Sequence, residues 1–428
     1  MILERFRHNL MVNNMGKNGH EDRVSVKQNL RKKLIIKTLI EAAEPVSVAE
    51  ITKKTSSNYP TINSLLSQLK EEEIVTELGL GESTGGRRPT LYRLNNEKLL
   101  FAGIEVGHTN NLLIIMNIEN RVIHSITTDS REIIASKNPL KMLADSCHNQ
   151  LISYLEGAGI PRENLQGVGI GFSGDLFKHF SGTKENDLEV LHRVERKLSM
   201  LMKIPVLIDI DVKLMTRAEK WFGKLKNVNN GLCINLTWGI GLGVIMGGTI
   251  QQGAHGHLEF GHITVREDGD LCYCGKRGCL ETIASGHELE KKAREKILAG
   301  EKTMLTEMIK GDVDRLEEDI IVTAALEGDI FSIELITEAA KVLGVQVANL
   351  IKLFDPEKIV INGTLSRAGR LLLNPIRTEV DKRALYYTKE SVPIETSDLG
   401  KTAIALGAAS MHIHEFLKDS TSDIVKFI

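Results

Sequence analysis

The chain has 428 residues, of which 42% are hydrophobic and 26% are charged, and its formal net charge is −2. This composition is typical of a globular protein with more than one domain core, and five cysteines are too few for a disulfide scaffold. No stretch approaches the roughly 20 apolar residues of a membrane helix, and the first residues lack the apolar core of a secretory signal. We therefore predict a cytoplasmic protein in which thiols stay reduced.

Residues 1–25 are predicted to form a flexible, basic tail. Nine lysines and arginines stand between Met1 and Lys37, against three acidic residues. A basic end on a nearly neutral chain favours an anionic partner. A solvated, disordered tail has the same charge pattern, so charge alone leaves both interpretations open.

Residues 26–96 are predicted to form a winged helix-turn-helix. Three helical patterns follow one another: an apolar stripe that Pro45 ends, a second helix capped by Ser47, and a third from about Tyr59 to Glu72. In a helix-turn-helix the second helix of the pair enters the major groove, and polar side chains near its start meet base edges. The outward-facing candidates for this contact are Tyr59, Thr61, Asn63 and Ser64.

A hairpin with a glycine-rich, basic tip follows these helices. The tip reads "GGRRP", and Arg87 and Arg88 are expected to lie along DNA phosphates or in a minor groove. Helices, polar face and tip together predict an operator-DNA-binding domain. The alternative is a small helical bundle whose hairpin binds only protein.

From about Leu99 onward, apolar strands alternate with helical segments, which predicts an α/β core for residues 97–428. Strand patterns include "GVGIGFSG" and "PVLIDID", and helical patterns occur near 140–157 and 334–354. Cys147 and Cys233 lie in apolar segments and are predicted to be core residues.

One histidine and three cysteines cluster between residues 262 and 279. His262, Cys272, Cys274 and Cys279 provide the Cys₃His set that zinc binds tetrahedrally in structural sites. We predict a zinc knot over 262–279. Two alternatives remain: a redox pair of Cys272 and Cys274, or a buried histidine among unrelated thiols.

The order of the motifs "GIEVGHT", "TWGIGLG", "LEFGH" and "CYCGKRGCLE" resembles the ROK family, which contains sugar-responsive repressors and sugar kinases. The resemblance covers about residues 28–412. It implies a two-lobed, actin-like sugar-kinase fold, and the His/Cys cluster matches the family's zinc ligands. It further implies that Glu259, His262 and Glu281 bind a sugar. The alternative for the two glutamates is that they are solvated loop residues.

Departures from the family's kinase motifs argue against phosphoryl transfer. Where the kinases have Glu-Asn-Asp-Ala-Asn, this chain has "DIDVK", so Asp211 keeps the position of the catalytic base while Ile210 and Lys213 replace the two asparagines. If this segment is a strand, Lys213 faces the same side as Asp211 and pairs with it. Trp238 replaces the threonine of the second phosphate loop, His108 follows the glycine of the first loop, and "GFSGD" replaces Gly-x-x-Gly-Pro. We predict no catalytic residues and no enzyme activity.

The predicted function is a transcriptional regulator of carbohydrate metabolism. Its N-terminal domain is expected to bind operator DNA, and residues 97–428 are expected to bind a sugar or sugar derivative and to form a homodimer or homotetramer. Two alternatives belong to other classes: an active sugar kinase with an accessory DNA-binding domain, and a ligand-independent DNA-binding scaffold.

Overall fold

The computed structural model describes residues 21–42, 44–81, 88–182, 188–253, 258–383 and 392–415. The chain divides into two compact units. The first holds the residues up to Asp209, apart from 186–188, together with those from Ala408 onward, and the second runs from Ile210 to Gly407. Among the described residues, no helix combines the length and the apolar character needed to cross a membrane.

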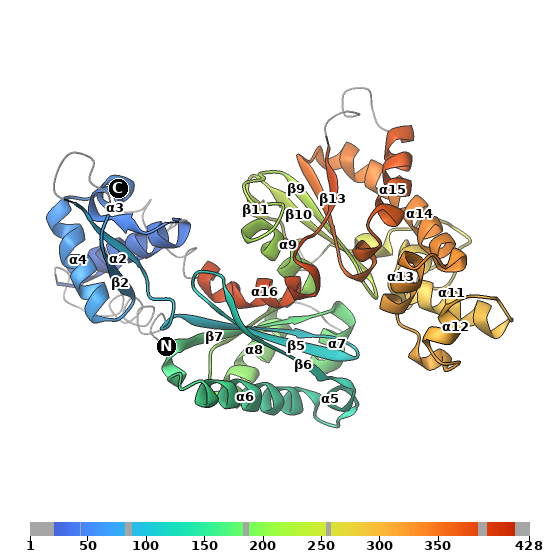
Figure 1. Ribbon diagram of the computed structural model, residues 1–428, viewed down its shortest axis with the longest axis horizontal. Coiled ribbons are helices and arrows are strands. Elements are labelled where there is room, and N and C mark those ends of the chain that lie inside the picture. The colour runs from blue at the N-terminus through green and yellow to red at the C-terminus, as the bar shows by residue number, and fades with distance from the viewer. Residues whose placement is uncertain are drawn as a thin grey trace. The chain divides into compact units, whose positions relative to one another are not determined.

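In its described part, the first unit begins with the helices α2, α3 and α4 and a small sheet of order β1-β3-β2, an arrangement that fits the predicted winged helix-turn-helix (Figure 1). Ser47 and Glu50 form a capping box at the start of the second described helix, and Asn58 caps the third through the Thr61 N–H at 3.0 Å. The elements are α2 (Glu21–Glu41), β1 (Val46–Ser47), α3 (Val48–Thr55), α4 (Tyr59–Glu71), β2 (Val75–Leu80) and β3 (Thr90–Leu94).

Part of the predicted basic tail is helical. Since α2 begins at Glu21, the predicted boundary after residue 25 falls inside a helix. Lys32 and Lys33 are buried, and the Lys32 Nζ atom donates to Glu72 Oε1 at 2.6 Å. These two lysines therefore pack within the domain, and residues 1–20 of the predicted tail lie outside the described residues.

The rest of the first unit is built on a five-stranded sheet of order β6-β5-β4-β7-β8, in which β4 and β7 run parallel. The strands are β4 (Leu100–Val106), β5 (Asn110–Asn117), β6 (Val122–Asp129), β7 (Leu165–Phe172) and β8 (Val206–Ile210). The helices are α5 (Arg131–Ala135), α6 (Pro139–Gly157), α7 (Gly174–Ser181) and α8 (Leu188–Met202), with the 3₁₀ turn η1 (Arg162–Asn164). Strands β4 and β7 are almost wholly buried, as their apolar sequences predict.

A second five-stranded sheet, of order β11-β10-β9-β12-β13, forms the centre of the second unit. Its strands are β9 (Gly231–Leu236), β10 (Ile240–Met246), β11 (Thr249–Ile250), β12 (Lys358–Asn362) and β13 (Ile394–Thr396). The helices are α9 (Asp211–Trp221), α10 (Glu281–Ala284), α11 (Gly286–Leu298), α12 (Leu305–Met308), α13 (Glu318–Leu326), α14 (Ile330–Phe354), α15 (Arg370–Arg383) and α16 (Ala403–Ala409), the last of which crosses the boundary between the units. Short 3₁₀ turns are η2 (Phe260–His262), η3 (Val313–Arg315), η4 (Thr364–Ala368) and η5 (Gly400–Thr402). Helices α14 and α15 pack side by side (Figure 1).

The two sheets with their helices confirm the predicted α/β class. Cys147 in α6 and Cys233 in β9 are buried and belong to the apolar core, as predicted. Burial raises the pKa of the Cys147 thiol to about 12, which keeps it protonated and unreactive near neutral pH.

Candidate functional site

The segment with the His/Cys cluster folds back on itself as a compact knot. His262 ends η2, and the residues after it pair through two isolated antiparallel bridges. Gly278 has φ of +68°, and a Cβ atom there would lie 1.5 Å from the Arg266 carbonyl oxygen. Because any other residue would clash there, only glycine allows the chain to pass so close to itself. Glycine at position 278 therefore lets Cys279 approach His262.

The four ligand atoms of the knot have the spacing of a tetrahedral metal site. They all lie within 4.8 Å of one another. His262 Nδ1 is 3.6 Å from Cys272 Sγ, and Cys274 Sγ is 3.6 Å from Cys279 Sγ. Tetrahedral zinc, with bonds of about 2.05 Å to nitrogen and about 2.3 Å to sulfur, would give separations of about 3.6 and 3.8 Å. The residues therefore fit a metal ion in both donor type and spacing.

Protonation of the thiols in the knot is coupled to the binding of a cation. Burial raises the pKa of Cys272 to about 12 and also raises that of Cys279. A bound cation reverses this preference because it stabilises the thiolate form. Binding a metal here would therefore release protons, and protons would compete with the metal as pH falls.

The two ring nitrogens of His262 face different surroundings. Nδ1 points to the cysteines and lies 3.6 Å from Glu281 Oε2. Nε2 lies 3.2 Å from the Tyr273 hydroxyl and 3.9 Å from Glu259 Oε2. With Nδ1 on a metal, Nε2 carries the hydrogen and can donate a hydrogen bond to a neighbouring acceptor, of which the Tyr273 hydroxyl is nearer than Glu259. His262 therefore connects the metal cluster to a neighbouring polar group.

The two predicted sugar-binding glutamates differ in their environments. Glu259 is 58% exposed in its side chain, which agrees both with a ligand-binding residue and with a solvated loop residue. Glu281 begins α10 and is buried, with Oε1 accepting the Ile240 N–H at 2.8 Å. Its Oε2 atom is buried without a hydrogen-bond partner among the described residues. Because a buried carboxylate oxygen without a hydrogen bond is costly, this atom is suited to accept a hydrogen bond from a ligand.

An aromatic group that sequence reasoning did not recognise lies next to His262. The ring of Trp238 is 4.6 Å from that of His287 and 5.6 Å from that of Tyr273, measured between centroids. Tyr273 in turn lies edge-on to His262 at 5.2 Å. The position of Tyr273 between two cysteines in "CYC" could have indicated its place beside His262, whereas nothing in the local sequence indicated that His287 belongs to this group.

The predicted strand through Asp211 is wrong. Strand β8 ends at Ile210, and Asp211 is the first residue of α9, with Oδ1 accepting the Val212 N–H at 2.7 Å. Asn235 donates to the other carboxylate oxygen at 3.5 Å. Positions two apart on a helix point in directions about 200° apart, so Lys213 does not share a strand face with Asp211 as predicted. A helix starts here because the aspartate accepts an N–H of its own first turn.

Two further departures from the kinase motifs meet in the first unit. His108 Nε2 lies 3.2 Å from Asp175 Oδ2, and the Ser173 hydroxyl donates to Asp175 Oδ1 at 2.7 Å. Burial alone would raise the pKa of Asp175, but the hydrogen bonds and the charge of His108 bring it below its ordinary value. The first glycine loop is thus tied to the start of α7 by an ion pair.

The candidate DNA surface follows the predicted pattern on α4. Tyr59, Asn63 and Ser64 are exposed and Thr61 is half-buried. The opposite face is buried and consists of Ile62, Leu65, Leu66 and Leu69. Arg88 is exposed beside the wing, while Arg87 lies outside the described residues. Sequence reasoning missed Lys53 and Lys54, both exposed in the last turn of α3.

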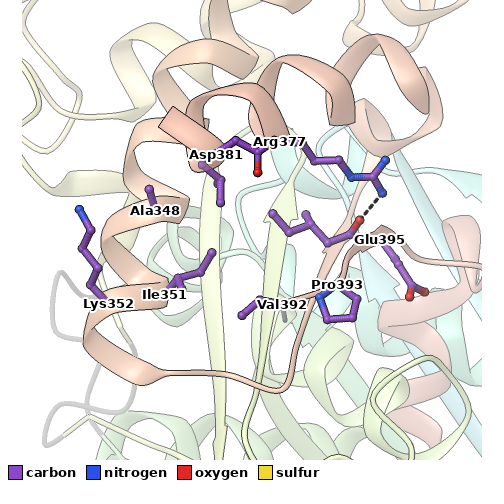
Figure 2. A pocket seen from close by; sticks show the side chains of 10 residues that line it. Ala348, Ile351, Lys352, Arg377, Asp381, Val392, Pro393 and Glu395 are labelled. Atoms are coloured by element: carbon purple, nitrogen blue, oxygen red, sulfur yellow. Dashed lines mark hydrogen bonds between the residues drawn. The ribbon is translucent and has the colours of Figure 1, made fainter. Parts of the chain in front are cut away.

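A separate cavity of about 300 Å³ lies between α14, α15 and the segment that leads into β13 (Figure 2). Arg377 crosses its edge and donates to the Ile394 carbonyl oxygen at 2.6 Å, occupying a backbone acceptor of the edge strand (Figure 2). None of the predicted ligand-binding residues lines this cavity. It is therefore not the site that the sequence predicts.

Comparison with known proteins identifies the class. Residues 101–415 match the ROK family, and the chain belongs to this family. It is 31% identical over 399 residues to the putative xylose repressor of Caldicellulosiruptor sp. (strain Rt8B.4), with 91% of this chain and 97% of the relative covered. It is also 24% identical to the N-acetylglucosamine repressor of Escherichia coli O157:H7, with 87% of this chain and 90% of the relative covered. The protein is a sugar-responsive transcriptional regulator of the ROK family.

A solved structure supports the fold over nearly the same length. The structure of a ROK family transcriptional regulator, a homologue of the E. coli MLC protein, covers 92% of this chain and 97% of its own, with a TM-score of 0.71 and 24% identity. This likeness confirms the combination of an N-terminal helical domain with an actin-like α/β fold.

Proposed function

We propose that the protein represses genes of carbohydrate metabolism by binding operator DNA, and that a sugar held by Glu259, His262 and Glu281 changes this binding. The observation that carries the proposal is the orientation of His262, whose Nδ1 faces the cysteines while its Nε2 faces Glu259. Carboxylates and a ring N–H suit sugar hydroxyls, which donate and accept hydrogen bonds at once. The Oε2 atom of Glu281, which has no hydrogen-bond partner in the described part of the chain and lies 3.6 Å from His262 Nδ1, adds a second acceptor beside the same ring.

The metal of the knot is zinc, in a structural role. Four protein ligands complete a tetrahedron and leave no open position for a reacting water, which is the pattern of structural zinc sites. When bound, the ion neutralises the buried thiolates and holds the loop together. The chain's own contribution is to fix the His262 ring, and through it the side chains that meet the sugar.

The protein is not a sugar kinase. Asp211 keeps the position of the base, but Trp238 brings a bulky ring to the loop that grips phosphate in the kinases. In the first loop, His108 is held by Asp175. These changes affect phosphate binding and leave Glu259, His262 and Glu281 in place, which supports binding without phosphoryl transfer.

The DNA-binding end uses α4 and the wing. Exposed polar residues at the start of α4 meet base edges, and Arg87 and Arg88 contact phosphate or the minor groove. One winged helix contacts one half-site, so we propose a homodimer or homotetramer that presents symmetry-related copies of α4 to operator DNA. A repressor acts where the chromosome is, which places it in the cytoplasm.

A binding experiment with the full chain tests this function. Duplexes enriched from a random library by the purified protein supply the operator, and fluorescence anisotropy then measures affinity with and without xylose, glucose or N-acetylglucosamine. We expect sequence-specific binding that at least one sugar changes several-fold. Sequence-independent binding that no sugar alters would favour the scaffold alternative, and sugar-dependent ATP consumption in a coupled assay would favour the kinase.

A further inference from the structure

Three rings form an exposed group on the second unit, which we call the aromatic platform: Trp238, Tyr273 and His287. Trp238 is partly exposed, Tyr273 is 58% exposed and His287 is exposed. The rings come from three separate segments, namely the loop between β9 and β10, the His/Cys knot and the start of α11. The platform borders the sugar-binding residues, since the Tyr273 hydroxyl lies 3.2 Å from His262 Nε2.

Backbone contacts hold the platform in place. The N–H groups of Gly286 and His287 donate to the carbonyl oxygens of Thr237 and Trp238, at 2.8 and 3.1 Å. The loop and the start of α11 are therefore joined directly beneath the Trp238 and His287 rings. A preformed surface of this kind loses little conformational entropy when a ligand binds.

The same contacts make the place unsuitable for phosphate. The start of a helix ordinarily binds anions through its free N–H groups. In α11 the first two N–H groups are occupied by the loop, and that of Glu288 by the Ser285 hydroxyl at 3.2 Å.

In the glycine loop itself, the Ile240 N–H already donates to a carboxylate, that of Glu281. A Cβ atom at Gly239 would lie 2.8 Å from the same Glu281 oxygen, so the carboxylate lies directly against the loop. A phosphate brought to this loop would meet a negative charge at short range.

We propose that the aromatic platform stacks against the ring of an uncharged sugar and makes the protein selective for free sugars over sugar phosphates. The inference rests on the proposed sugar-binding role of Glu259, His262 and Glu281. A sugar has polar edges and a less polar face, so carboxylates can meet its hydroxyls while an aromatic ring covers its C–H groups. With Trp238 in it, the loop that binds phosphate in the kinases instead forms part of a surface that binds an uncharged sugar ring.

The chain offers a direct optical test because it contains only two tryptophans. The variant Trp221→Phe leaves Trp238 as the single indole reporter. In this variant, xylose, glucose and N-acetylglucosamine are titrated while emission is recorded, with glucose 6-phosphate as the charged match to glucose. We expect at least one free sugar to shift Trp238 emission saturably, and its affinity in calorimetry to equal that of the parent. Glucose 6-phosphate is expected to bind at least tenfold more weakly than glucose.

Substitutions in the platform separate stacking from folding. Trp238→Ala should weaken binding of the free sugar roughly tenfold, the factor that corresponds to about 1.4 kcal/mol. Tyr273→Phe keeps the ring and should retain most of the affinity, whereas Tyr273→Ala should lose several-fold. Metal content and melting temperature of each variant are compared with the parent, so that damage to the knot is recognised.

The outcomes distinguish the platform from the proposed function. If calorimetry shows no free sugar binding to the parent, sugar sensing and the platform both fail. If a free sugar binds but Trp238 emission is unchanged and intact Trp238→Ala binds it equally well, the platform is wrong while sugar sensing stands. Tighter binding of glucose 6-phosphate than of glucose, or saturable quenching by an ATP analogue, would overturn the selectivity argued from the occupied amides.

Discussion

Replacing Cys279 by serine should remove the metal and destabilise the second unit. The thiol is fully buried, and its sulfur is 3.6 Å from that of Cys274. Serine leaves three ligands and buries a hydroxyl group. Cys233→Ser is the matched control, because Cys233 is equally buried but lies in β9, away from the knot. Both variants carry the cost of a buried hydroxyl, about 1–3 kcal/mol, and only Cys279→Ser also loses a ligand.

The difference between the two variants measures the metal's contribution. Structural zinc binds with about 10–16 kcal/mol in small domains, so losing one of four ligands should cost at least about 3 kcal/mol beyond the control. For a unit of this size, that corresponds to a further drop of roughly 6–12 °C in melting temperature. Elemental analysis after dialysis against a chelator should find one zinc per parent chain and per Cys233→Ser chain, but far less in Cys279→Ser. Equal metal content and equal melting temperatures in the two variants would refute the tetrahedral site.

Three other predictions concern DNA, ligand and pH. Arg88→Ala should weaken binding to all duplexes and reduce the slope of log affinity against log salt by about 1, whereas Asn63→Ala should relax the sequence preference. If anisotropy titrations find both the salt dependence and the specificity unchanged, another surface of the protein binds the DNA. Glu259→Gln should weaken the response to sugar at least tenfold and leave ligand-free DNA binding intact, and a full response in the same titration would exclude Glu259 from the site. The pKa of Asp175 is below its ordinary value when folded, so its contribution to stability is present above that ordinary value and is lost as pH falls through the folded pKa. The stability difference between the parent and Asp175→Asn in urea titrations should therefore shrink from pH 5 to pH 3, and a constant difference would contradict the His108–Asp175 pair.

Local chemistry made the N-terminal domain and the knot predictable. Ser47 precedes an apolar-periodic segment and has Glu50 three residues later, so the capping box could be expected from spacing alone. The Cys₃His set likewise depends on residues close together in sequence. In both cases the interactions that decide the structure are short-range.

Longer-range interactions were not predictable in the same way. Glu281 was expected either to bind a sugar or to be a solvated loop residue, and its place at the start of a short helix, with its side chain on the backbone of β10 41 residues earlier, was not foreseen. His287 joins Trp238 only because α11 starts against the β9–β10 loop. Asp211 was assigned to a strand because "PVLIDID" alternates, yet the aspartate starts a helix. Such outcomes depend on which segments meet in three dimensions, and a single sequence does not state this.

The central claim is that sugar binding and operator binding are coupled, and reciprocal titrations test it most directly. Anisotropy gives operator affinity with and without saturating sugar, and calorimetry gives sugar affinity with and without saturating operator. Linkage requires the two ratios to be equal, and a coupling of roughly 1–3 kcal/mol would make each about 5–150-fold. We predict equal ratios in this range, with Glu259→Gln reducing the response. Sugar binding that leaves operator affinity unchanged would contradict the account.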